Sequence, residues 1–153
     1  MPTPATPFTQ ETALKKVKAA QDLWNTRDPV RIAEAYAPDT VWRNRGTFLK
    51  GKDEVVKFLE EKWAKEYCYV LRKELFAFQD NKIAVQFFYE WNDQPEGKGQ
   101  WYRTYGLEDW TFLDSGLMYK RQMSGNDVAI QDEERWFSPG GDINGFEIAE
   151  KHL

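Results

Sequence analysis

Trp24–Gly51, which reads WNTRDPVRIAEAYAPDTVWRNRGTFLKG, carries more information about the fold than any other segment of the chain. Asp28 can cap a helix whose first residue is Pro29, because its carboxylate accepts from free backbone amides and proline already has a helical φ. The side of this predicted helix that faces the core carries Val30, Ile32, Ala33, Tyr36 and Ala37. The helix is predicted to end at Pro38, and a short strand is expected at Thr40–Arg45.

Helical periodicity continues on both sides of this segment. Thr9 is a suitable N-cap for a first helix that extends to about Asn25, and a third helix is predicted from Asp53 to Ala64. The inward positions of these two helices are Leu14, Val17, Gln21 and Trp24, and Val55, Val56, Leu59 and Trp63. The remaining pattern is typical of strands joined by turns, at Tyr67–Phe78, Lys82–Trp91, Gln100–Leu113 and Leu117–Ser124. Helices at the front followed by consecutive antiparallel strands predict an α+β fold.

Composition indicates one domain. The chain has 153 residues with 21 basic and 25 acidic side chains, for a formal net charge of −4. Neither nucleic acid nor a membrane is expected as a partner, because the basic surface that phosphates require and the roughly 20 apolar residues of a bilayer span are both missing. The single cysteine, Cys68, excludes an internal disulfide, and the start of the chain does not resemble a signal peptide. We expect a cytoplasmic protein with a loose lead-in at residues 1–8, one domain at 9–137, and a tail at 138–153 that is either packed on the domain or mobile.

Several kinds of site are excluded by the residue types present. The only histidine is His152, next to the C-terminus, which argues against a histidine-based catalytic triad or metal site. Cys68 lies between two tyrosines in a predicted strand, so a buried structural thiol is expected there. The chain contains neither GxGxxG nor a P-loop. No cofactor or metal is therefore expected, and acid–base chemistry would depend on Asp, Glu, Tyr or Arg.

Glu108 is the main candidate for chemistry. Strand alternation within Gln100–Leu113 places it on one face with Tyr102, Thr104, Gly106, Trp110 and Phe112. A carboxyl group among bulky apolar neighbours either pairs with a cation or has a raised pKa, and both states are useful in a site. A structural salt bridge, or a bulge that shifts the alternation, is the alternative interpretation.

The order helix, short helix, strand, helix and then strands resembles the nuclear-transport-factor-2-like (NTF2-like) superfamily, the SnoaL-like cone-shaped α+β fold of ketosteroid isomerases, scytalone dehydratase, limonene epoxide hydrolase and polyketide cyclases. The resemblance implies a curved, mostly antiparallel sheet around a pocket, with three N-terminal helices packed on it. When Tyr36–Asn44 and Leu107–Phe112 are matched to ketosteroid isomerases, Asn44 falls at the position of the aspartate base. Glu108 falls at the position of the protonated aspartate of the oxyanion hole.

The same matches also argue against the reactions of these relatives. Ala20 falls where ketosteroid isomerases have the oxyanion tyrosine, and Met123 falls where limonene epoxide hydrolase has one of its aspartates. A closer resemblance is to an uncharacterised, domain-of-unknown-function branch of the superfamily, which implies no established reaction. Its blocks cover most of residues 10–136 and are VWRNR (41–45), FLEEKW (58–63), KELFAF (73–78), KIAVQFFYEW (82–91), QWYRTYGLEDWTF (100–112), GLMYKR (116–121) and NDVAI (126–130).

Arg121 completes the expected site. It lies five residues after Gly116, a position that faces the cavity in the superfamily. The resemblance therefore implies a pair with Glu108 at the pocket floor, or an arginine that binds a carboxylate or phosphate oxygen; the alternative is a surface arginine. The expected pocket residues are Trp24, Trp42, Asn44, Trp63, Gln86, Phe88, Glu90, Tyr102 and Trp110, of which Trp42, Phe88 and Trp110 are expected to line one dominant cavity.

The opposite face of the Glu108 strand predicts an interface. Trp101, Arg103 and Tyr105 lie on it, and a homodimer through this outer face is expected because large aromatic side chains are costly to leave in water. Two functions remain open. One is an enzyme that acts on a small, partly apolar metabolite by isomerase, lyase or hydrolase chemistry through Glu108 and Arg121. The other is a non-catalytic module that binds or senses such a molecule. Carbohydrate binding on exposed aromatics and peptide binding are weaker alternatives.

Overall fold

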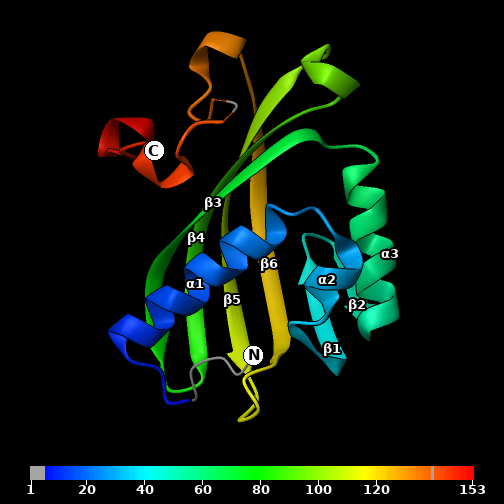
Figure 1. Ribbon diagram of the computed structural model, residues 1–153, viewed down its shortest axis with the longest axis vertical. Helices are drawn as coiled ribbons and strands as arrows, with labels where there is room; N and C mark the ends of the chain where they lie inside the picture. The colour runs from blue at the N-terminus through cyan, green and yellow to red at the C-terminus, as the bar shows by residue number, and fades with distance from the viewer. Residues whose placement is uncertain (1–5, 139) are drawn as a thin grey trace.

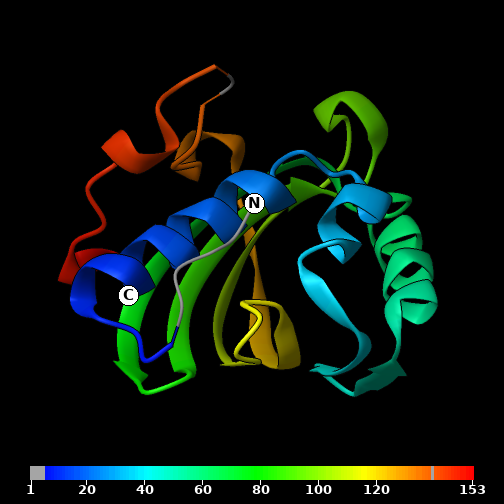
Figure 2. The ribbon, with the colours of Figure 1, turned by 60° about the horizontal axis from the view of Figure 1, so that its bottom comes forward.

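A strongly curved sheet of six strands forms the framework of the molecule, with the helices on its concave side (Figures 1 and 2). The computed structural model describes residues 6–138 and 140–153. The helices are α1 (Gln10–Trp24), α2 (Pro29–Ala33) and α3 (Lys52–Trp63). The strands are β1 (Tyr36–Asn44), β2 (Thr47–Lys50), β3 (Tyr67–Gln79), β4 (Lys82–Asn92), β5 (Trp101–Phe112) and β6 (Met118–Ile130). Their order is β2-β1-β6-β5-β4-β3, with only the β1–β6 pair parallel. The predicted α+β cone with three helices is therefore confirmed.

The segment around Pro38 differs from the prediction. Helix α2 ends at Ala33, and Pro38 lies inside β1 instead of ending the helix. The strand tolerates this proline because the β1–β6 register is irregular between Tyr36 and Val41. Val30 is exposed, so the buried side of α2 is limited to residues such as Ile32. The short strand β2, which pairs with β1, was not predicted.

Helix α1 protects the edge of the sheet at β3. The Gln21 Oε1 atom accepts from the Lys73 backbone amide at 2.8 Å, and Asn25 Oδ1 accepts from the Leu71 amide at 2.9 Å. These bonds satisfy amides that a free edge strand would leave open for pairing with another chain. At the start of the helix, Phe8 is buried and packs on Phe112, so the expected loose lead-in does not extend to this residue. Residues 1–5 of that lead-in lie outside the described residues.

The concave face of β4 is the opposite of the one predicted. Val85 and Phe87 point into the core, whereas Gln86, Phe88 and Glu90 point to the outer face. The prediction that these three residues face inward is wrong. Alternation does not distinguish the two faces, because the core covers Phe87 and the C-terminal segment covers Phe88. Phe88 lies on the opposite side of the sheet from Trp42 and Trp110, which are packed in the core, and the predicted cavity lined by all three is not formed.

The outer face is partly covered by the chain's own C-terminal segment, drawn from orange to red in Figure 1. The Trp136 ring lies 3.7 Å from the Arg103 guanidinium, and Arg103 Nε donates to Glu90 at 2.9 Å. Arg72 Nη1 holds the segment by donating to the carbonyls of Ile143 and Phe146. The tail is thus packed on the domain, although Pro139 lies outside the described residues.

This arrangement corrects the reason for expecting a dimer contact at Trp101, Arg103 and Tyr105. Trp101 and Arg103 are already buried within one chain, and Tyr105 is half-buried beside Trp136. Water is therefore excluded from these side chains without a second subunit. In the described part of the chain, no helix combines the length and the apolar character needed to cross a membrane.

Candidate functional site

Three charged side chains meet at the centre of the concave face, and we call Lys73, Glu108 and Arg121 the inner charge cluster. Glu108 accepts from Lys73 Nζ at 2.7 Å through Oε2, and from Arg121 Nε at 3.1 Å through Oε1. Trp110 Nε1 also donates to Oε1, at 2.5 Å. The three charged side chains are 1–4% exposed. The predicted Glu108–Arg121 pair is present, with a second cation that was not predicted.

The cluster holds Glu108 in its ionised form. Burial alone would raise the pKa of Glu108, but the positive charges of Lys73 and Arg121 outweigh burial and lower it to about 2. Burial lowers the pKa of Lys73, and the attraction of Glu108 offsets only part of this effect. When Lys73 is protonated, two cations share one carboxylate, and the cluster then carries an uncompensated positive charge in a region where an unpaired charge is costly.

Aromatic rings enclose the two cations. The Arg121 guanidinium lies 4.8 Å from the Trp24 ring centroid and 4.4 Å from that of Trp42. Lys73 Nζ lies 5.5 Å from the Trp24 ring and 5.4 Å from the Trp110 ring. The faces of aromatic rings attract cations and partly replace their hydration. These rings, together with the carboxylate of Glu108, are the physical reason why two cations can remain inside the cone.

Asn44 connects the cluster to a hollow at the open end of the cone. Its Oδ1 accepts from Arg121 Nη1 at 3.0 Å, and the residue also lines a pocket of about 280 Å³ between α3, β1 and β4 that we call the mouth pocket. The mouth pocket is lined by Asn44, Arg45, Thr47, Phe58, Glu61, Lys62, Lys65, Glu66 and Tyr89. A molecule bound there would be separated from Arg121 by only one side-chain amide.

Several hydrogen-bond donors beside the mouth pocket remain unused. Arg121 directs Nε and Nη1 to Glu108 and Asn44, while its Nη2 has no hydrogen-bond partner among the described residues. Buried Trp42, whose ring packs on Phe58 of the mouth pocket, has an Nε1 that likewise finds no acceptor in the described part of the chain. The same holds for Nε1 of Trp63, whose ring packs on Trp24. Buried donors normally have partners, so the two indole N–H groups suit the oxygen of a ligand or a water molecule.

The structure brings together only part of the predicted pocket. Trp24, Trp42, Asn44 and Trp110 contact the inner charge cluster, and Trp63 packs on Trp24. Tyr102 does not reach the cluster. Its ring stacks on Trp91, with 4.6 Å between the ring centroids. It lies six residues from Glu108 along β5, which places the two residues about 20 Å apart at ~3.3 Å per residue. Gln86, Phe88 and Glu90 lie on the outer face, as described above.

Lys73 is the functional candidate that sequence reasoning missed. Within the predicted strand Tyr67–Phe78, Lys73 shares one face with Leu71 and Leu75. A lysine between two leucines on the same face indicates that the lysine is buried. The signal was overlooked because lysine is rarely buried unless it is paired. Its partner lies 35 residues later in the chain, so the pairing could not be read from local sequence.

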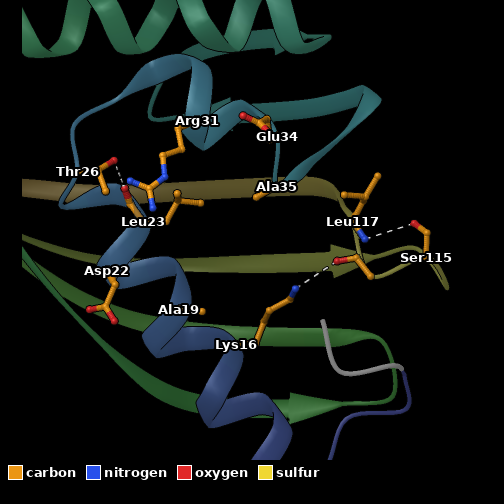
Figure 3. Close-up of a pocket in the computed structure, with 11 residues that line it drawn as sticks. Lys16, Ala19, Asp22, Leu23, Thr26, Arg31, Glu34, Ala35, Ser115 and Leu117 are labelled. Carbon is orange, nitrogen blue, oxygen red and sulfur yellow. Dashed lines mark hydrogen bonds between the residues drawn. The ribbon is translucent and has the colours of Figure 1, made fainter. Parts of the chain in front are cut away.

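A second hollow lies away from the inner charge cluster. A cleft of about 540 Å³ separates α1 from α2 and from the turn between β5 and β6, and Lys16 reaches across it (Figure 3). As for metals, no group of three or more His, Cys, Asp or Glu side chains within residues 6–138 and 140–153 is arranged to hold an ion.

Known proteins similar to this chain share its fold at low sequence identity. SalBIII, an epoxide hydrolase/cyclase-like enzyme of pyran ring formation in polyether salinomycin, has a TM-score of 0.64 and 15% identity, with 76% of this chain and 93% of that chain covered. An NTF2-like protein from Burkholderia pseudomallei has a TM-score of 0.65 and 18% identity, with 74% and 90% covered. RV0760c from Mycobacterium tuberculosis, in complex with estradiol-17beta-hemisuccinate, has a TM-score of 0.61 and 18% identity, with 74% and 93% covered.

These identities establish a shared NTF2-like fold and nothing finer. A search of curated proteins found no match to the chain. A family match, by contrast, covers residues 6–138, which is most of the chain. The chain belongs to the family described as "Protein of unknown function (DUF1348)", a branch of the NTF2-like fold.

Proposed function

We propose that this protein binds a small, partly apolar metabolite that carries an anionic oxygen, and that the metabolite enters through the mouth pocket. The observation that carries the proposal is the uncompensated positive charge of the inner charge cluster, with the unused Nη2 of Arg121 next to Asn44. An anionic oxygen at this position would balance the charge and accept from a guanidinium that can donate in a bidentate manner.

The surrounding rings support the apolar part of the proposed ligand. Trp42 and Phe58 lie between the mouth pocket and the cluster, and the Trp42 indole N–H is available to a second acceptor atom. Ligand sites generally combine apolar walls with a few well-placed polar groups, and this region has that composition. RV0760c was solved with the anionic ligand estradiol-17beta-hemisuccinate, and this precedent in the same fold is compatible with the proposed ligand class.

Acid–base catalysis is the second candidate function. The structure favours Lys73 over the expected Glu108 as the residue that carries the proton. With a pKa of about 2, Glu108 is ionised at neutral pH, has no proton to donate and is a weak base. Lys73 is better suited because burial lowers its pKa. In an isomerase, lyase or hydrolase of this design, Glu108 would hold Lys73 and Arg121 in position, and Arg121 would stabilise negative charge on the substrate.

Calorimetry with two matched probes tests the binding proposal. 2-Naphthoate carries the proposed anionic oxygen, and 2-naphthamide has nearly the same shape without the charge. We expect 2-naphthoate to bind at least about tenfold more tightly, a difference of roughly 1.4 kcal/mol. Equal affinities, or no binding of either probe, would contradict the proposal. Native mass spectrometry of the purified protein can then identify a natural ligand.

Charge variants show whether the inner charge cluster is responsible. Asn44→Asp places a carboxylate beside Arg121, so it should compensate the surplus charge and weaken 2-naphthoate binding by about tenfold or more. Asn126→Asp adds the same charge on the outer face and serves as the matched control. Similar losses in both variants would indicate a general effect of net charge and would count against the proposed site.

A homodimer through the outer face and a cytoplasmic location remain part of the proposal. The tail leaves Phe76, Leu107 and Val128 exposed on this face, and they offer apolar area for a subunit contact in place of Trp101 and Arg103. The single cysteine is compatible with a reducing compartment. Sedimentation of the wild type and of Leu107→Glu tests the dimer, because the variant should be monomeric. A wild-type protein that is monomeric at micromolar concentration would exclude it.

A further inference from the structure

The cleft between α1, α2 and the β5–β6 turn contains an amine in an unusual environment. Lys16 extends from α1 toward the turn that holds Ser115 and Leu117 (Figure 3), and its Nζ donates to the Gly116 carbonyl at 3.2 Å. The amine also lies 5.0 Å from the centroid of the Phe112 ring. It is half-buried at the wall of a hollow of about 540 Å³, large enough for a small organic molecule.

No carboxylate of the described residues compensates the charge of Lys16. Asp22 and Glu34 line the same cleft, but neither forms an ion pair with it. A partly desolvated lysine without an ion pair favours its neutral form, which is the nucleophilic form of the amine. The Gly116 carbonyl can accept an N–H from the neutral amine as well, which leaves the nitrogen lone pair available to a ligand.

We propose that Lys16 is a carbonyl-reactive amine that forms an imine with small aldehydes or ketones that enter this cleft. In the reaction the Lys16 nitrogen adds to the carbonyl carbon, the carbonyl oxygen leaves as water, and a C=N bond replaces the C=O bond. No oxidant or reductant is required. The site is separate from the inner charge cluster, so it does not depend on the function proposed there.

The expected selectivity follows from the amine's basicity. Burial lowers the pKa of Lys16 to about 8, so roughly a quarter of the amine is neutral at pH 7.5, against about 0.1% for an ordinary lysine with a pKa of ~10.4. A less basic nitrogen is also a weaker nucleophile, which removes about a factor of ten from this advantage. The net expectation is that Lys16 reacts about tenfold faster than an exposed lysine of the same protein.

Reductive trapping provides the test. The intact protein is incubated at pH 7.5 with low propanal and sodium cyanoborohydride, which converts the imine to a stable secondary amine, and modified lysines are located by peptide mass spectrometry. Lys15 is the internal control, because it is the adjacent residue and its side chain is 68% exposed. Modification of Lys16 about tenfold faster than Lys15 supports the proposal. Equal or slower modification of Lys16 overturns it.

A pair of variants at Ala19, which lines the cleft one turn from Lys16, checks the cause. Ala19→Glu places a carboxylate three residues from Lys16 on the same helix and should return its rate to that of Lys15. Ala19→Gln has the same size without the charge and should retain most of the fast rate. If both variants slow the reaction equally, or if neither does, the proposed origin of the reactivity is wrong.

Discussion

Replacing Glu108 by Gln should destabilise the protein by about 3–5 kcal/mol, because it removes the single carboxylate of the inner charge cluster while keeping the volume. The distances of 2.7 Å to Lys73 and 3.1 Å to Arg121 correspond to gross attractions of about 6 and 5 kcal/mol at an effective dielectric constant of ~20. Lys73 can lose its proton in the variant, which limits the cost. Arg121 cannot, and it would remain as an unpaired buried cation.

Replacing Lys73 by Met should have a very different effect. The Arg121–Glu108 pair remains balanced, and the methionine side chain can pack among the Phe87, Trp24 and Trp110 rings that now surround the amine. We expect a change within about 1 kcal/mol of zero in either direction. Two substitutions that each remove one member of the same ion pair are thus predicted to differ by several kcal/mol.

Urea unfolding followed by tryptophan fluorescence measures both free energies of unfolding. In a thermal scan the loss for Glu108→Gln corresponds to about 6–20 °C at roughly 2–4 °C per kcal/mol for a domain of this size. Glu74→Gln is the matched control, because its carboxylate also pairs with two cations, Lys18 and Arg72, but is 38% exposed and should cost at most about 1 kcal/mol. Equal losses in Glu108→Gln and Lys73→Met would refute the assignment of a surplus positive charge.

Three further outcomes follow from individual contacts. The pKa of Glu108 falls from 4.5 to about 2 on folding, so its ionised form stabilises the protein above pH 4.5, and this contribution is lost as the pH falls toward 2. Free energies of unfolding measured at a series of pH values should show this loss in the wild type and a smaller loss in Glu108→Gln. A methyl group at Gly106 would collide with the Phe87 ring, so Gly106→Ala should cost about 1–3 kcal/mol and should cost less in a Phe87→Leu background, as measured by urea unfolding. Trp136→Ala removes the ring that covers Arg103 and stacks on Phe146. Backbone amides of residues 142–153 should then exchange faster with solvent, while those of β5 remain protected. Unchanged exchange in residues 142–153 would exclude this anchoring role.

The sequence was sufficient for the order of the three helices and of the longer strands, and for the central carboxylate. Asp28 with Pro29, the alternation around Glu108, and the strand pattern at Tyr67–Phe78 and Lys82–Trp91 are local signals, and the structure has the corresponding helix, inner face and hairpin. The Glu108–Arg121 pair could be inferred because the superfamily resemblance supplied the relation between β5 and β6. Local chemistry and the superfamily topology were together adequate at these positions.

Other features depend on contacts that no local pattern contains. Both faces of β4 are buried, because the core covers Phe87 and the C-terminal segment covers Phe88, so alternation could not tell the inner face from the outer one. The role of Lys73 depends on Glu108, 35 residues away, and the burial of Arg103 depends on Trp136, 33 residues away. Pro38 is a strong helix-ending signal, but the irregular β1–β6 register allows it within a strand.

The tryptophan indole signals in a ¹⁵N–¹H correlation spectrum give the most direct test of the central claim that an anionic ligand binds beside Arg121. The seven indole N–H groups can be assigned by Trp→Phe variants, and the spectrum is then recorded during titration with 2-naphthoate. We expect a saturable shift of the Trp42 signal, whose N–H has no acceptor among the described residues, with little change for Trp136 on the outer face. The shift should be absent with 2-naphthamide and strongly reduced in Asn44→Asp. An unchanged Trp42 signal under saturating 2-naphthoate, or the same shift with the uncharged amide, would contradict the claim.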